Sequence, residues 1–156
     1  MTKPGQAMES GPGGRPALGS NFLVDFGNGK SRQSSGGFAE VIFPEFRLGT
    51  PGDNTPATPG NVIARSAETG STLILKRGVC GALDLYTWWD RARNGKAPAK
   101  KSLKVQLLSP DHQTVVLTWT FHKVRPVALS YSPLRAQESE VVMETIECTF
   151  SSFELS

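Results

Sequence analysis

Residues 71–95 read STLILKRGVCGALDLYTWWDRARNG and hold the one helical pattern in the sequence. The apolar run at Thr72–Leu75 predicts a short strand, which Lys76 extends. The basic pair and glycine at this point, Lys76, Arg77 and Gly78, predict a turn. An amphipathic helix is then expected from about Gly81 to Arg93. The stretch therefore predicts a strand, a turn and a helix inside a chain that is otherwise β-like.

Two adjacent tryptophans mark the predicted helix. Its apolar residues recur at helical spacing and line one face: Leu85, Trp88, Trp89 and Ala92. Asn94-Gly95 predicts the C-terminal stop. Neighbouring side chains on a helix point about 100° apart, so at most one of the two rings could form a base-stacking platform while the other packs inward. We predict that Trp88 or Trp89 anchors the helix onto the β-structure.

The chain from Asn21 onward otherwise reads as strands. Alternating or continuous apolar runs predict them at 22–26, 38–43, 61–64, 72–76, 103–107, 115–121, 127–131 and 140–150. Pro110-Asp111-His112 predicts a turn. At least seven strands with one helix favour an antiparallel barrel or two packed sheets over a βαβ fold. The fold class expected is mainly β.

The length of 156 residues suits one domain. Residues 1–20 cannot bury enough apolar surface to offset their ordering entropy, so we expect a disordered extension before a domain at 21–156. Prolines and glycines exclude a regular element from Gly49 to Gly60. A loop of this length in a compact domain is usually functional or mobile. Its central residues are Gly52, Asp53 and Asn54.

Charge and cysteine content exclude several classes of protein. The net charge is +3 and the isoelectric point is near 9.0, whereas nucleic-acid binders usually carry a sharper basic stripe. Cys80 and Cys148 form no CxxC pair, so we expect two buried thiols and no zinc site. No apolar run approaches the roughly 20 residues that span a membrane, and Met1–Leu18 lacks the apolar core of a signal peptide. We therefore expect assembly in the cytoplasm and no membrane insertion.

Candidate catalytic motifs are incomplete. Gly29-Lys30-Ser31 resembles the end of a phosphate-binding loop, but the required earlier glycine is Val24, so a hairpin turn is the better interpretation. His112 and His122 show no spacing to a nucleophile or metal ligand. The acidic residues near the last strand are typical of a solvated face or of ion pairs. We predict no enzyme activity, no cofactor and no metal site.

Taken together, the order of motifs resembles one family. These motifs are Phe38-Ala39-Glu40-Val41, Glu45–Gly49, Leu73–Val79, the Leu85/Trp88/Trp89 spacing, Trp119-Thr120-Phe121, Pro126 and Glu140–Glu147. They are similar to the tail-tube family of contractile-tailed phages and related contractile injection systems. The resemblance covers roughly Asn21 to Leu155, and its most specific part is Leu-Lys-Arg-Gly-Val followed by the Trp-Trp helix.

The resemblance implies a fold and a set of partners. The fold would be a small β-barrel of two packed antiparallel sheets flanked by one α-helix, like the haemolysin-coregulated proteins. Homo-hexameric rings would stack into an inner tube, the conduit for a protein effector or DNA as cargo. A contractile sheath, a baseplate hub or spike and a cap protein would be the partners, in a phage tail or an injection particle. The Gly52-Asp53-Asn54 loop would contact the next ring, and Lys76-Arg77-Gly78 would contact a neighbouring subunit.

Alternatives remain open at this point. Ile42-Phe43-Pro44 replaces the Gly-Leu usual in this family, which leaves open a tube-initiator ring on the baseplate hub. A second alternative is a secreted ring protein of the type VI kind that acts as a cargo chaperone. A third, from another class, is a single-stranded nucleic-acid-binding barrel that uses the Lys96–Lys104 stretch.

Overall fold

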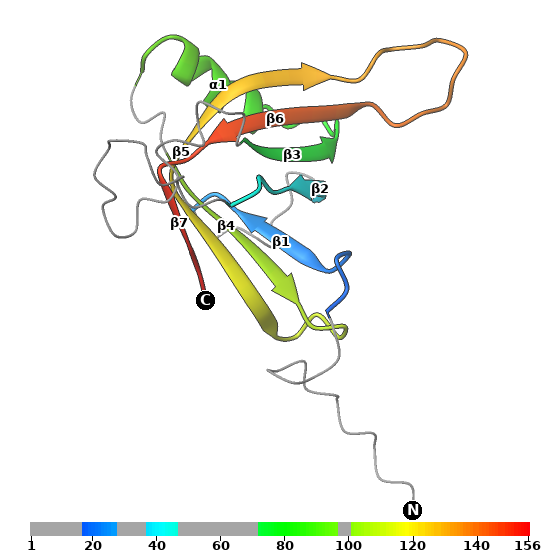
Figure 1. Cartoon of the computed structure of the whole chain (residues 1–156). Coiled ribbons are helices and arrows are strands. Elements are labelled where there is room, and N and C mark those ends of the chain that lie inside the picture. The colour runs from blue at the N-terminus through cyan, green and yellow to red at the C-terminus, as the bar shows by residue number, and fades with distance from the viewer. Residues whose placement is uncertain (1–16, 28–36, 47–71, 97–100) are drawn as a thin grey trace, which may run out of the picture.

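The computed structural model describes residues 17–27, 37–46, 72–96 and 101–156 (Figure 1). In chain order the elements are β1 (Phe22–Asp25), β2 (Phe38–Ile42), β3 (Leu73–Gly78), α1 (Asp84–Arg93), β4 (Lys101–Leu108), β5 (Val115–Tyr131), β6 (Met143–Thr149) and β7 (Ser152–Leu155). All strand pairs are antiparallel. The mainly β fold class with one helix is confirmed.

Strand β5 belongs to both sheets. Its first part pairs with β4 along one edge and with β7 along the other, so that Thr120 lies between Lys104 and Glu154. Its second part pairs with β6, which continues the sheet through β3 to β2. The change occurs near Lys123, whose φ is 53°, and the pairing with β6 shifts register between Pro126 and Ala128. The prediction of two separate strands here is wrong, because the irregularity bends the strand without ending its pairing.

The two sheets do not close into a barrel. The strand order is β1-β4-β5-β6-β3-β2, and among the described strands the terminal β1 and β2 are not hydrogen-bonded to each other. In Figure 1 the sheet that contains β1, β4 and β7 lies below the sheet that contains β3 and β6. The predicted pair of packed sheets with one flanking helix is therefore present, with both sheets open at their edges.

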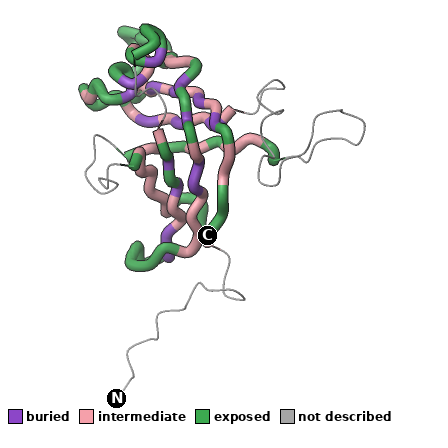
Figure 2. Tube along the Cα trace, turned by 90° about the vertical axis from the view of Figure 1, so that its left-hand side faces the viewer, coloured by how far each residue is buried: buried purple, intermediate pink, exposed green. Residues whose placement is uncertain are grey.

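The core fills the space between the sheets and under the helix. Figure 2 shows buried positions alternating with partly buried or exposed ones along the strands, as expected for strands with one face inward. The buried side chains come from both sheets and α1: Leu73, Leu75, Leu85, Trp88, Leu103, Val105, Phe121, Val124, Ile146, Cys148 and Phe150. Phe121 lies at an aromatic cluster, with its ring centroid 4.8 Å from that of Phe150. The buried-thiol prediction is correct for Cys148 and wrong for Cys80, which is exposed.

The last strand, predicted at 140–150, is shorter than expected, and a second strand follows it. Regular pairing in β6 begins only at Met143, and a break at Phe150-Ser151 turns the chain into β7, which the sequence did not predict. Residues 132–142 form a loop that, with the ends of β5 and β6, extends away from the sheets (Figure 1). The predicted strand at 61–64, the loop at 49–60 and Lys30-Ser31 lie outside the described residues, as does most of the predicted extension at 1–20.

Candidate assembly site

Lys76, Arg77 and Gly78 complete strand β3. The predicted turn is wrong, since β3 runs on through these residues to Gly78. It pairs with β2 as far as Arg77 and with β6 as far as Gly78. The inward alternation that starts at Leu73 and Leu75 continues to Arg77, and all three side chains are buried. The alternation could not be recognised in the sequence because its third inward residue is an arginine. Arginine is rarely buried unless it is paired, so the sequence pattern favoured an exposed position.

The Arg77 guanidinium is the centre of a buried ion-pair network. Its Nε donates a hydrogen bond to the carboxylate of Glu144, its cross-strand neighbour on β6, which is also buried. The guanidinium also donates to Asp84 at the start of α1, with 3.1 Å between Nη1 and Oδ2. The Cζ atom of Arg77 lies 5.5 Å from the ring centroid of Phe38 on β2. One side chain therefore connects β2, β3, β6 and α1 within a single subunit.

The charges of this network are mutually stabilised. Burial by itself would raise the pKa of Asp84, but the hydrogen bond and positive charge of Arg77 outweigh it and hold the pKa below its usual value. Burial likewise opposes the charge on Arg77, but its bonds to Asp84 and Glu144 leave the Arg77 pKa above its usual value. Arg77 and Asp84 are therefore both charged at neutral pH, and the geometry of the network suits bracing the helix start on the sheet.

The residues beside Arg77 face other surroundings. Lys76 points to the other side of the strand, where its Nζ lies 3.2 Å from Glu40 Oε2 in a partly exposed ion pair. Gly78 lies against the chain that enters β6, since a Cβ there would meet Val141 Cγ1 at 3.3 Å. Next to it, Val79 N–H donates to the Val142 carbonyl at 2.8 Å. A side chain at position 78 would therefore press on the Val141 methyl at the base of the 132–142 loop, and that methyl would have to move by a few tenths of an ångström.

The two tryptophans of α1 occupy different environments. Trp88 is 2% exposed and packs edge-to-face on Phe26, with 5.4 Å between ring centroids. Lys101 Nζ lies 5.3 Å from the Trp88 ring, and burial lowers the pKa of this lysine. Trp89 is half-buried, and Arg93 Cζ lies 4.8 Å from its ring centroid. Trp88 therefore holds the helix on the sheets, whereas Trp89 presents its ring at the surface.

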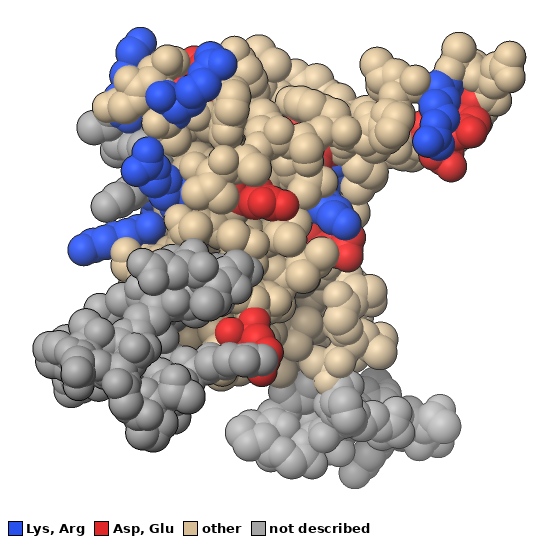
Figure 3. Space-filling model, turned by 45° about the horizontal axis from the view of Figure 1, so that its top comes forward, with Lys and Arg blue, Asp and Glu red and all other residues tan. Residues whose placement is uncertain are grey.

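A shallow groove lies beside Trp89. Its volume is about 460 Å³, and its lining includes Trp89 and Arg93 from α1 and Arg125, Pro126 and Val127 from β5. Figure 3 shows Lys and Arg side chains gathered at the end of the molecule where α1 lies. The exposed basic residues on α1 and on β5 near its bend are Arg91, Arg93, Lys123 and Arg125.

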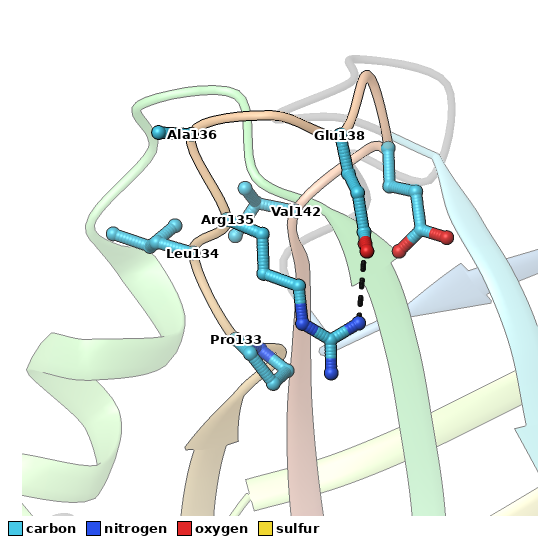
Figure 4. Close-up of a pocket in the computed structure, with 7 residues that line it drawn as sticks. Pro133, Leu134, Arg135, Ala136, Glu138 and Val142 are labelled. Atoms are coloured by element: carbon cyan, nitrogen blue, oxygen red, sulfur yellow. Dashed lines mark hydrogen bonds and ion pairs between the residues drawn. The ribbon is translucent and has the colours of Figure 1, made fainter.

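The loop at 132–142, which we call the arm, carries an exposed apolar surface that sequence reasoning missed. Leu134 is 82% exposed and Val141 is 70% exposed. Arg135 Nη1 lies 3.1 Å from Glu138 Oε2, and Figure 4 shows the Leu134 side chain directed away from this ion pair. The signal available in the sequence was Pro133 and the polar run after it, which interrupt the apolar alternation.

Each sheet ends in strand edges without a partner among the described strands. These edges are β1 and β7 in one sheet, and β2 and the second part of β5 in the other. Unpaired edges can accept a further strand from another chain. Gly52, Asp53 and Asn54, the predicted ring-to-ring contact, lie outside the described residues.

The part of the chain that the structure describes contains no cluster of three or more side chains suited to hold a metal ion. In the same residues, no helix has the length and apolar character needed to cross a membrane.

Comparisons with solved structures find the same fold in several contractile assemblies. The chain aligns with the cap of the anti-feeding prophage at a TM-score of 0.68 and 15% identity, over 91% of each chain. It aligns with the sheath-tube complex of PVC, an extracellular contractile injection system, at 0.65 and 15% identity, also over 91% of that chain and 90% of this one. Hcp1 from Flavobacterium johnsoniae matches at 0.55 and 10% identity, over 87% of this chain and 94% of that one.

Sequence comparison identifies the family. None of the curated proteins matches the chain significantly. Residues 19–154 match the family of the T4-like virus tail tube protein gp19, which is nearly the whole chain and includes all the described strands except the last residue of β7. The chain therefore belongs to the tail tube family of the T4-like virus protein gp19.

Proposed function

We propose that this chain is the inner tube subunit of a contractile particle and that it assembles as stacked hexameric rings. The observation that carries the proposal is the pair of open sheets in a member of the tail tube family. Each sheet offers two edges, so copies placed side by side can continue a sheet from one subunit to the next. Pairing of this kind satisfies backbone groups that a lone subunit leaves to water.

The similar structures support the partners of such a subunit. One is described as a sheath-tube complex, one as a cap, and one as a 6-fold symmetrised baseplate. We infer a sheath around the tube, a baseplate hub or spike at its start, a cap at its end, and a protein effector or DNA as cargo. The particle would assemble in the cytoplasm and function as part of a phage tail or an injection device.

Electron microscopy of the purified protein over a range of concentrations tests the proposal. We expect rings at moderate concentration and stacked tubes at high concentration, because edge pairing and stacking are both association equilibria. A protein that stays monomeric and forms no rings at any concentration contradicts it.

The second candidate is a single ring at one end of the tube, either the tube initiator on the baseplate or a terminator. Its support is the alignment with the anti-feeding prophage baseplate and cap chains, at TM-scores of 0.60 and 0.68. Co-expression with the sheath protein separates the two roles. If the chain is the tube subunit, we expect long tubes surrounded by sheath. If it is an initiator or terminator, we expect single rings and no long tubes.

Two further alternatives have direct tests. The similarity to Hcp1 supports a ring of the type VI kind that carries cargo, and neighbouring genes for membrane-complex components instead of a sheath and a LysM-type tail protein would favour it. The nucleic-acid alternative requires salt-sensitive binding of single-stranded DNA. We expect fluorescence anisotropy to detect none.

A further inference from the structure

The arm and the Trp89 groove lie at opposite ends of one sheet. At one end of the β5–β6 pair, Arg125 faces Thr149 beside the groove, and at the other end Tyr131 faces Glu144 at the base of the arm. Six residue steps of strand separate the ends, roughly 20 Å at the usual rise. The start of α1 at Asp84 lies near the base of the arm through Arg77 and Glu144, whereas Trp89 and Arg93, farther along the helix, line the groove at the other end. Figure 1 shows the arm extending away from the rest of the molecule. The arm therefore cannot reach the groove of its own chain.

The two surfaces have complementary charges. On the arm, Arg135 is paired with Glu138, while the exposed Glu140 makes no ion pair among the described residues. In the groove, Arg93 is paired with Asp90, while the exposed Arg125 makes no ion pair with any described residue. The arm thus carries a negative charge at Glu140 and the groove carries a positive charge at Arg125, and neither is paired with a described residue of its own subunit.

The two surfaces also share apolar character. The arm exposes Leu134 and Val141, and the groove is lined by Trp89, by Pro126 and by Val127, which is 49% exposed. Apolar side chains flanked by charged ones are typical of contact surfaces in assemblies, where an aromatic ring and an arginine often anchor the contact.

We propose that the arm of one copy docks into the Trp89 groove of a second copy, with Glu140 paired to Arg125. This inference rests on the proposed tube function and names one contact within that assembly. The contact joins two different patches, so every copy offers one arm and one groove. Such a heterologous contact builds a ring or a stack and does not stop at a dimer.

Charge reversal tests the contact. Arg125→Glu and Glu140→Arg each place like charges together, so each should raise the concentration needed for assembly about tenfold, the effect of roughly 1.4 kcal/mol. An equimolar mixture of the two variants should restore assembly, because alternating copies regain opposite charges at every contact. The double variant should assemble alone for the same reason. Sedimentation velocity and electron microscopy measure both effects.

Control variants separate the possible failures. Arg91→Glu changes the net charge equally on an exposed α1 residue that does not line the groove, and it should assemble as the wild type does. Circular dichroism should show unchanged melting for all variants, since the residues are exposed. If Arg125→Glu assembles normally, or if the mixture is not restored, the arm contact is overturned while the tube function stands. A wild-type protein that never assembles overturns both.

Discussion

Arg77 and Lys76 are adjacent basic residues with opposite roles, because successive side chains of a strand point to opposite faces. Arg77 is fully buried against Glu144 and Asp84, and Lys76 forms a partly exposed pair with Glu40. Removing one partner of a buried ion pair leaves an uncompensated charge in the interior, whereas a surface pair contributes little.

We therefore predict that Arg77→Met lowers the free energy of unfolding by about 3–5 kcal/mol. The matched variant Lys76→Met should change it by less than about 1 kcal/mol. Urea denaturation followed by circular dichroism measures both values. Equal effects of the two substitutions would show that Arg77 does not brace the fold.

Acid should weaken the same network through Asp84. The folded state holds the Asp84 pKa below its usual value, so the ion pair contributes its full stability above the unfolded pKa of about 3.9 and loses it as pH falls through the folded pKa. We predict that the free energy of unfolding declines below about pH 4. Asp84→Asn should be less stable at neutral pH and should show a shallower decline.

The pKa of Asp111 is also below its usual value, because the Ser109 hydroxyl and the Gln113 N–H donate hydrogen bonds to its carboxylate. Asp111 therefore also contributes to the loss of stability in acid. It is present in both proteins, so the difference between the two pH profiles isolates Asp84. Parallel profiles for wild type and Asp84→Asn would refute the assignment.

Helix α1 is attached to the sheets through one face that a single tryptophan dominates. Trp88 is buried against Phe26, whereas Trp89 is half-buried beneath Arg93. We predict that Trp88→Ala lowers the free energy of unfolding by about 3–5 kcal/mol, the usual cost of a large aromatic cavity.

Trp89→Ala should cost the isolated subunit only about 1 kcal/mol, mainly its contact with Arg93. Thermal unfolding of both variants below the assembly concentration measures the difference. Because Trp89 lines the proposed groove, its substitution should weaken assembly more than its small effect on folding suggests. A larger loss of folding stability from Trp89→Ala than from Trp88→Ala would reverse this assignment.

At the scale of the whole molecule, charges at opposite ends make assembly sensitive to salt. The proposed contact joins exposed charges. At 1 M salt the Debye length falls to about 3 Å, and exposed charges that lie farther apart than this are largely screened. We predict that wild-type assembly needs a higher protein concentration as salt rises.

The single variant Arg125→Glu should respond in the opposite direction, since salt then screens a repulsion. The double variant with Glu140→Arg should follow the wild type. Light scattering over a salt series measures all three. The same salt response in all three proteins would mean that other charges govern assembly.

Local sequence determined the classes of the elements. Alternating apolar residues form strands β1, β4 and the first part of β5, and apolar residues at helical spacing form α1, because each pattern places one apolar face on a core. The order of motifs also carried the family resemblance, since it depends only on residue types and spacing, and the match over residues 19–154 bears it out.

Tertiary structure decided what depends on distant partners. Arg77 becomes a buried brace only because Glu144, 67 positions away in sequence, lies across from it. Strand β5 stays continuous past Pro126 because β6 takes over as its partner, and the arm and groove become opposite ends only when β5 and β6 pair. Periodicity reports which face of an element is apolar, but pairing between remote segments sets which charges are buried and which edges stay open.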